Sequence, residues 1–123
     1  MKLGTSTETE LARYHNNSRA SRGLNRLTLD VSLSDKARAH SRAMARQARI
    51  FHSSNLSRTY GSGEGTRYLG ENVGVGASMR SLHDAFMRST GHRANILKRQ
   101  YKRVGVGVVR SGSRYYVTVA FLG

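Results

Sequence analysis

The sequence contains no cysteine and no proline among its 123 residues. The absence of cysteine excludes disulfides, thiolate zinc sites, iron–sulfur clusters and cysteine nucleophiles, while the redox compartment stays open. About six prolines would be expected at average usage, so their absence is unusual for a domain that contains loops. No apolar run approaches the roughly 18 residues that span a bilayer, and the first residues lack the apolar segment of a secretory signal.

Several common functional motifs are absent as well. The chain has no P-loop, no dinucleotide-binding glycine fingerprint, no Gly-x-Ser-x-Gly nucleophile elbow and no His-Glu-x-x-His helix. The glycine-rich segment 61–65 is not followed by a lysine, so we do not expect it to cradle a phosphate. The best-known nucleotide-binding, α/β-hydrolase and zinc-protease classes therefore find no support.

Acidic residues are few, and arginine is abundant. The 21 basic and 7 acidic residues give a formal net charge of +14, and 17 of the basic residues are arginine. Such a surface attracts polyanions, which here means nucleic acid, anionic lipid or an acidic cell-wall polymer. Simple solubility explains the same charge equally well.

The length fits a single domain. We expect residues 10–123 to form it, and residues 1–9 to be the artificial start of an expressed domain or a disordered arm. A short strand or extended connection is expected over 24–30. Apolar residues recur at helical spacing in four segments, which predict helices over residues 8–23, 34–49, 78–89 and 91–97.

The end of the chain predicts a β-hairpin. Its strands are Val104–Val109 and Tyr115–Leu122, and Ser111-Gly112-Ser113 supplies the turn. Gly105 and Gly107 would clear one face of the sheet for a close helix or for the floor of a cleft. Because helices come first and antiparallel strands last, the predicted class is α+β.

The middle of the chain is rich in serine and glycine. Residues 52–69 are expected to form a long loop, and the glycine-rich segment 70–76 is expected to continue it as a turn. The apolar positions of the other elements define an expected core. Its members are Leu33, Ala37, Met44, Leu82, Phe86, Ile96, Val106, Val117, Val119 and Phe121.

A stripe of arginines occupies another face of the helix predicted over 34–49. It is expected to be a solvated face or a docking face for an anion. Its members are Arg38, Arg42, Arg46 and Arg49.

Three of the five histidines favour structural roles. His40 lies on the apolar face of its helix and is expected to be a hydrogen-bonded core residue. His83 flanks an apolar face and is expected to be structural or exposed. His15, Asn16 and Arg19 share one side of the first helix, which predicts a buried polar network.

The other two histidines favour a site. His52 and His92 each lie beside a helix end, next to glycine or serine, and Glu71 lies between them in the sequence. Two imidazoles and one carboxylate suit a Zn²⁺ ion with an open coordination position. Their spacing alone does not establish that they meet.

Three short motifs occur in a fixed order: His15-Asn16-x-x-Arg19, Gly70-Glu71-Asn72-Val73 and Gly91-His92-Arg93-Ala94-Asn95-Ile96-Leu97. They resemble signatures of the CAP superfamily, which comprises cysteine-rich secretory proteins, antigen 5 and pathogenesis-related proteins. The chain is most similar to the compact, disulfide-free bacterial branch with SCP-like domains. The resemblance runs from about Glu10 to Gly123.

This resemblance implies an α-β-α sandwich, with an antiparallel sheet between helices, and a surface cleft that holds two histidines and two acids. His52 and His92 match the histidines, and Glu71 matches one acid. The segment 87–89, where the second acid belongs, contains no carboxylate. Residues that match the motifs around the cleft are expected to support it structurally: His15, Asn16, Arg19, Asn72, Arg93 and Asn95.

We therefore expect a monomeric, secreted or cell-envelope binding module that is non-catalytic and requires no cofactor, although the cleft would bind Zn²⁺ or another divalent metal weakly. Its ligands would be a lipid, a cell-wall polymer or another polyanion, and charge alone adds nucleic acid. The alternatives are a metal-assisted hydrolase that uses the same cleft, and a domain that binds polyanions through its charge. Ser53 and Ser89 are the candidate nucleophiles of a hydrolase.

Overall fold

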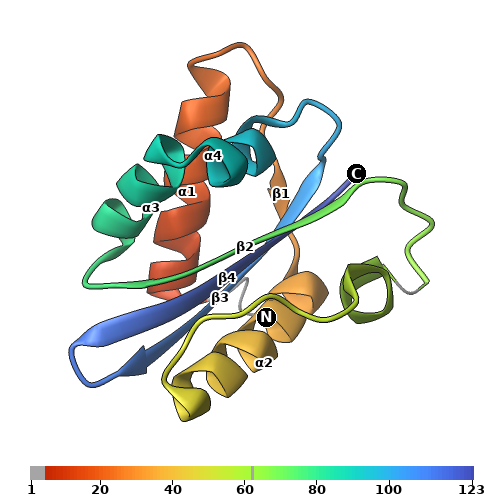
Figure 1. Cartoon of the computed structure of the whole chain (residues 1–123). Helices are drawn as coiled ribbons and strands as arrows, with labels where there is room; N and C mark the ends of the chain where they lie inside the picture. The colour runs from red at the N-terminus through yellow and green to blue at the C-terminus, as the bar shows by residue number, and fades with distance from the viewer. Residues whose placement is uncertain (1–4, 62) are drawn as a thin grey trace.

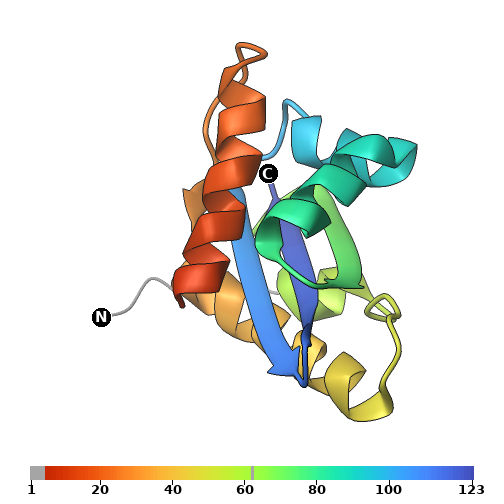
Figure 2. The ribbon, with the colours of Figure 1, turned by 90° about the vertical axis from the view of Figure 1, so that its left-hand side faces the viewer.

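The computed structural model describes residues 5–61 and 63–123. The elements in chain order are α1 Ser6–Ala20, β1 Thr28–Leu29, α2 Val31–Gln47, the π-helical turn η1 Ser57–Gly61, β2 Leu69–Gly76, α3 Met79–Arg88, α4 Thr90–Leu97, β3 Arg103–Ser111 and β4 Arg114–Leu122. The strands form one sheet, with α2 on one face and α1, α3 and α4 on the other (Figures 1 and 2). The α+β class and the α-β-α layering predicted from the sequence are confirmed.

The strand order of the sheet is β1-β3-β4-β2. β1 runs parallel to β3, and the other neighbours are antiparallel. β1 pairs with β3 only at Thr28 and Leu29. Further along this edge of β3, side chains accept the hydrogen bonds of the backbone N–H groups. Ser34 Oγ accepts from the Val106 N–H, and Glu8 Oε2 accepts from the Val108 N–H, each at 3.0 Å.

Two helices begin earlier than predicted because of the residues that cap them. Thr5 caps α1 in a reciprocal arrangement with Glu8, so residues 6–9 form helix rather than an arm. Residues 1–4 of the expected arm lie outside the described residues. Asp30 caps α2 through the Leu33 N–H at 2.8 Å, so this helix starts at Val31. None of the helices in the described part of the chain is long and apolar enough to cross a membrane.

The prediction of a turn over 70–76 is wrong, because this segment is strand β2. It pairs with β4 along its whole length, from Leu69 opposite Leu122 to Gly76 opposite Tyr115. Glycine disfavours strands in general, but here it makes room for α3. A Cβ added at Gly74 would lie 3.1 Å from the Phe86 ring, and one at Gly76 would lie 3.0 Å from Leu82.

The predicted hairpin is confirmed, with β3 and β4 paired in antiparallel register. Of the two roles expected for its glycines, close packing of a helix is the correct one. An added Cβ would lie 2.5 Å from the backbone of Leu33 at Gly105, and 2.1 Å from the backbone nitrogen of Arg38 at Gly107. The backbone of α2 therefore rests directly on β3.

All ten residues predicted for the core are buried, each at most 4% exposed. Most of them lie in one cluster between the sheet and the layer formed by α1, α3 and α4. The core also contains side chains outside that list, among them two fully buried tyrosines: Tyr60, in η1, and Tyr101, just before β3. Tyr60 lies inside the segment expected to be loop, and its hydroxyl belongs to the site described next.

Candidate functional site

A cleft of about 290 Å³ opens where the loop after α2, strand β2 and the junction of α3 and α4 meet. His52, Glu71 and His92 all line it, although they are far apart in the sequence. The structure thus brings together the three residues singled out as a candidate site. The remaining lining residues are Asn72, Ser89, Gly91 and Asn95.

Glu71 is the buried centre of this cleft, with 4% of its surface exposed. Oε1 accepts from His52 Nδ1 and from the Ser53 N–H, both at 2.9 Å. Oε2 accepts from Ser53 Oγ and from the Tyr60 hydroxyl, both at 2.6 Å. Burial by itself would raise the pKa of Glu71, but these hydrogen bonds outweigh burial and hold the pKa below its ordinary value. Glu71 is therefore an ionised carboxylate whose two oxygens are both engaged.

The two histidines differ in exposure and in hydrogen-bond partners. The side chain of His52 is 62% exposed, and Glu71 accepts the proton of its Nδ1, so the neutral form of the ring carries its lone pair on Nε2. His92 is half-buried, stacks on Phe86 at 5.0 Å between ring centroids, and places Nδ1 2.8 Å from Ser89 Oγ. Burial, followed by electrostatic repulsion from the nearby His52 ring, lowers the pKa of His92. A neutral His92 is the form that could ligate a metal.

The donor atoms set a limit on metal binding. The part of the chain that the structure describes holds no group of three or more His, Cys, Asp or Glu side chains placed to share an ion. Both oxygens of Glu71 already accept hydrogen bonds from within the fold. This donor set does not fit a closed structural metal centre, and it leaves at most the two imidazoles as protein ligands for an ion.

The amide side chains of Asn72 and Asn95 hold the backbone of His92 in place. Asn72 Nδ2 donates to the His92 carbonyl at 3.0 Å, and Asn95 Nδ2 donates to Asn72 Oδ1 at 2.9 Å. The Tyr101 ring closes this end, because its hydroxyl would lie 2.2 Å from a Cβ added at Gly70. Arg93, named with this group from the sequence, is exposed on α4.

The motif in α1 forms a buried polar network away from the cleft. Arg19 is 0% exposed and donates to the carbonyls of Asn25, Ile96 and Lys98 at 2.7, 2.9 and 2.7 Å. Asn16 exchanges two hydrogen bonds with the backbone of Leu27. The network ties α1 to the end of α4, which holds His92 near its start.

The remaining histidines are hydrogen-bonded in the interior or at its rim. His40 is half-buried, and its ring nitrogens lie 2.6 Å from the Phe51 carbonyl and 3.3 Å from Ser53 Oγ. His83 is 7% exposed and pairs with His15. Of the roles expected for His83, the structural one is correct.

The arginine stripe on α2 does not form one continuous free face. Arg38 makes a two-pronged ion pair with the buried carboxylate of Glu8, at 2.6 and 2.8 Å, and is therefore a structural residue. Arg49 lies beyond the end of α2, with its guanidinium 4.6 Å from the centre of the Phe51 ring. Arg42 and Arg46 are exposed on α2.

Two hydroxyl groups hold Glu71 behind the cleft. Ser53, expected from the sequence only as a candidate nucleophile, donates to Glu71 Oε2. The Tyr60 hydroxyl donates to the same oxygen, and nothing in a segment expected to be loop distinguished Tyr60 in the sequence.

Comparisons with known proteins agree on one family. The sequence model of CAP, the cysteine-rich secretory protein family, matches residues 12–121. The protein YkwD of Bacillus subtilis is 35% identical over an alignment of 125 positions, which covers 94% of this chain and 47% of YkwD. The chain thus spans about half the length of this curated relative.

Two solved structures share the fold. An extracellular protein containing a SCP domain from Bacillus anthracis has a TM-score of 0.82 and 25% identity, covering 94% of this chain and 40% of that one. An outer surface protein from Borrelia burgdorferi has a TM-score of 0.84 and 16% identity, covering 99% of this chain and 96% of that one.

Proposed function

The chain belongs to the cysteine-rich secretory protein (CAP) family, and from this premise we propose that it is a non-catalytic binding module whose ligand site is the cleft of His52, Glu71 and His92. The observation that carries the proposal is that both carboxylate oxygens of Glu71 already accept hydrogen bonds from within the fold. An ionised carboxylate that accepts four hydrogen bonds from its own fold is a weak proton acceptor. It holds the cleft in shape and orients His52, while the imidazoles remain available to a ligand.

A divalent metal is one ligand that this cleft would accept. Zn²⁺ would be held by His52 and His92, with Glu71 orienting the His52 ring from behind. When bound, such an ion supplies a Lewis-acidic centre that attracts anionic ligands. Because two imidazoles alone make a poor site, binding is weak, and it weakens further below about pH 6 because a histidine must be neutral to ligate a metal.

Histidine NMR spectra recorded during a Zn²⁺ titration test the proposal. The ring signals of His52 and His92 shift together in the wild type, while those of His15 and His83 serve as internal controls. His52→Ala and His92→Ala each abolish the saturable shift of the remaining cleft histidine. Shifts that persist unchanged in both variants would place the metal elsewhere and overturn the cleft as the ligand site.

A hydrolase is the second candidate, because Ser89 Oγ lies 2.8 Å from His92 Nδ1, the distance of a nucleophile–base pair. The acid that would orient such a base is missing, since Glu71 pairs with His52 instead. Esterase and peptidase assays on Ser89→Ala and His92→Ala distinguish the two candidates. Hydrolysis by the wild type that both variants lose would establish the hydrolase.

We propose further that the module acts outside the cell or in its envelope, in line with the extracellular Bacillus anthracis protein of the same fold. A wall or envelope polyanion would complement its net charge of +14. Binding through charge alone collapses as salt rises, whereas cleft binding changes little with salt but is lost in His92→Ala. A salt series on both proteins separates the two modes.

A further inference from the structure

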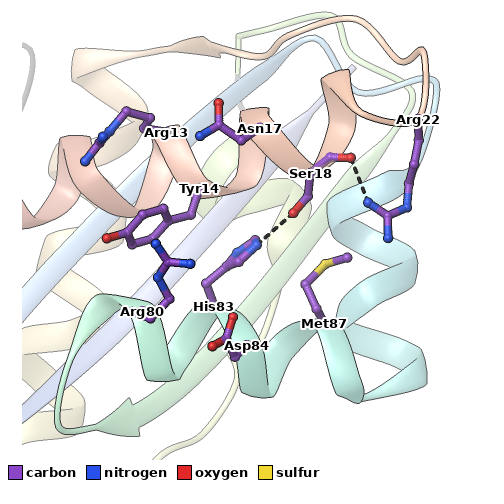
Figure 3. A pocket seen from close by; sticks show the side chains of 9 residues that line it. All are labelled: Arg13, Tyr14, Asn17, Ser18, Arg22, Arg80, His83, Asp84 and Met87. Carbon is purple, nitrogen blue, oxygen red and sulfur yellow. Dashed lines mark hydrogen bonds between the residues drawn. The ribbon is translucent and has the colours of Figure 1, made fainter.

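A second pocket, which shares no residue with the cleft, lies in the groove between α1 and α3. It encloses about 440 Å³. Figure 3 shows that side chains from α1 form one wall of the pocket and side chains from α3 form the other. From α1 and the turn after it come Arg13, Tyr14, Asn17, Ser18 and Arg22, and from α3 come Arg80, His83, Asp84 and Met87.

Three guanidinium groups surround this groove. Arg22 lies at one end and Arg80 at the other, with Ser18 and His83 between them (Figure 3). Both Arg80 and Arg13 lie near the face of the Tyr14 ring, at 4.6 and 5.5 Å from its centre. Among the described residues, none of the three arginines forms an ion pair. Three cations and the single carboxylate of Asp84 leave the groove positively charged.

Arg22 is already anchored on one side. Its Nη1 donates to the Ser18 carbonyl at 2.9 Å and to Ser21 Oγ at 3.3 Å. This contact uses one edge of the guanidinium, and the fork of Nη2 and Nε remains able to donate. Arg80 is held only by its stacking on Tyr14 among the contacts of the described residues. A planar group held in this way presents its donors without first having to be ordered.

The buried histidine pair determines what Ser18 can do. His15 Nδ1 and His83 Nδ1 are 2.8 Å apart, so one ring donates and the other accepts. If His83 donated, His15 would carry its proton on Nε2, a buried atom with no partner among the described residues. That arrangement costs more than an unpaired lone pair, so His15 donates to His83.

The proton of His83 then lies on Nε2, which is 2.9 Å from Ser18 Oγ. Ser18 Oγ therefore accepts from His83, and the Ser18 O–H remains free to donate. Figure 3 shows Ser18 pointing from α1 across the groove toward His83, between the two arginines. The middle of the groove thus offers a neutral donor flanked by two cationic ones.

We propose that the groove between α1 and α3 binds a phosphate group, with Arg22 and Arg80 on two of its sides and the Ser18 hydroxyl in the middle. A phosphate dianion has several acceptor oxygens in a tetrahedral array, and it needs donors from more than one direction. The volume exceeds that of a bare phosphate, so a phosphate monoester with a small organic group also fits. Arg13 adds positive charge at the rim.

Titration with inorganic phosphate, followed by backbone and histidine NMR at constant ionic strength, tests this site. Saturable shifts at Ser18, Arg22, Arg80 and His83 are expected, and glycerol 3-phosphate provides the second arm. Tighter binding of the glycerol ester would assign an organic monoester, and equal binding would assign free phosphate. Arg22→Gln and Arg80→Gln each weaken binding by roughly threefold to tenfold.

Arg42→Gln is the matched control, because it removes the same charge from an exposed position on α2, on the opposite face of the sheet. It leaves the phosphate affinity unchanged, and so does His92→Ala, which disables only the cleft. All three arginines are exposed, so the variants stay folded, which a thermal melt verifies. Absence of saturable shifts in the wild type, or equal losses in Arg42→Gln and Arg80→Gln, would overturn the site.

Discussion

Glu8 of α1 and Arg38 of α2 form an ion pair around the edge of the sheet, from helices on its two opposite faces (Figure 2). Glu8 is completely buried, and its Oε2 also accepts the free N–H of Val108 on β3. Burial raises the pKa of Glu8, but the bonds from Arg38, Thr5 and Val108 outweigh burial and lower the pKa overall. One carboxylate thus caps a helix, joins two layers and covers an exposed strand edge.

Replacing Glu8 by Ala should therefore destabilise the fold by roughly 2–4 kcal/mol, because a buried N–H and a guanidinium lose their partner together. Urea unfolding measures the change. Asp35→Ala is the control, since Asp35 is the exposed second partner of Arg38 and should contribute less than about 1 kcal/mol. Equal losses in the two variants would show that the buried contact is not the important one.

The contact between α2 and β3 should not tolerate a single added methyl group. Gly107→Ala would place a Cβ 2.1 Å from the Arg38 backbone nitrogen, so the helix must move, at a cost of roughly 3 kcal/mol. Gly91→Ala, at the start of α4, meets nothing within 4 Å and should be neutral or slightly stabilising. Thermal unfolding of the pair checks this difference, and a harmless Gly107→Ala would mean that α2 packs less closely.

Truncation of the central aromatic residues should be among the most costly changes. Phe86 is 4% exposed and Phe121 is 0% exposed, and each replacement by Ala should cost on the order of 3–5 kcal/mol. Ile50→Ala serves as the control, because Ile50 is 44% exposed and outside the core. A loss below about 1 kcal/mol in both phenylalanine variants would contradict the packing described.

Acid should destabilise the protein, beginning with its buried histidines. Burial, followed by the charge of His83, lowers the pKa of His15 from 6.5 to about 3. Burial also lowers the pKa of His83, where the charges of Arg80 and Arg22 act in the same direction and Asp84 acts against them. Below about pH 6.5 these histidines are therefore protonated in the unfolded chain but not in the folded one. The free energy of unfolding falls by about 1.4 kcal/mol for each such proton with every unit that the pH decreases.

Further acidification should add the loss from Glu8 and Glu71, whose folded-state pKa values lie below 4.5. Their contribution is complete above about pH 4.5 and disappears as the pH falls through the lower folded-state values. Urea unfolding at a series of pH values measures both stages. His83→Gln should reduce the slope between pH 7 and 5, and an unchanged slope would show that His83 titrates freely in the folded protein.

The sequence by itself determined the elements whose signal is local. Ser78 and the apolar spacing of Met79, Leu82 and Phe86 place α3 within a residue of its observed bounds. The apolar, β-branched and aromatic runs at 104–109 and 115–122, separated by Ser111-Gly112-Ser113, predict the hairpin that the structure contains. The motifs at 70–73 and 91–97 singled out Glu71 and His92, and the family resemblance that they carry added His52.

Only the tertiary structure decided the roles of residues that stand in no recognisable local pattern of the sequence. Gly70–Gly76 is a strand because it pairs with β4, and Gly74 and Gly76 leave the space that α3 occupies. No neighbour in the sequence reports either contact. Tyr60 binds Glu71, and Glu8 binds Arg38, through contacts that the folding of distant segments creates. The arginine stripe on α2 shows the same limit, because helical periodicity grouped Arg38 with Arg42. In the folded protein Arg38 pairs with the buried carboxylate of Glu8 on α1, whereas Arg42 stays exposed. Periodicity reports which side of a helix is polar, whereas the partner across the fold decides whether a charge is solvated, paired or free to bind.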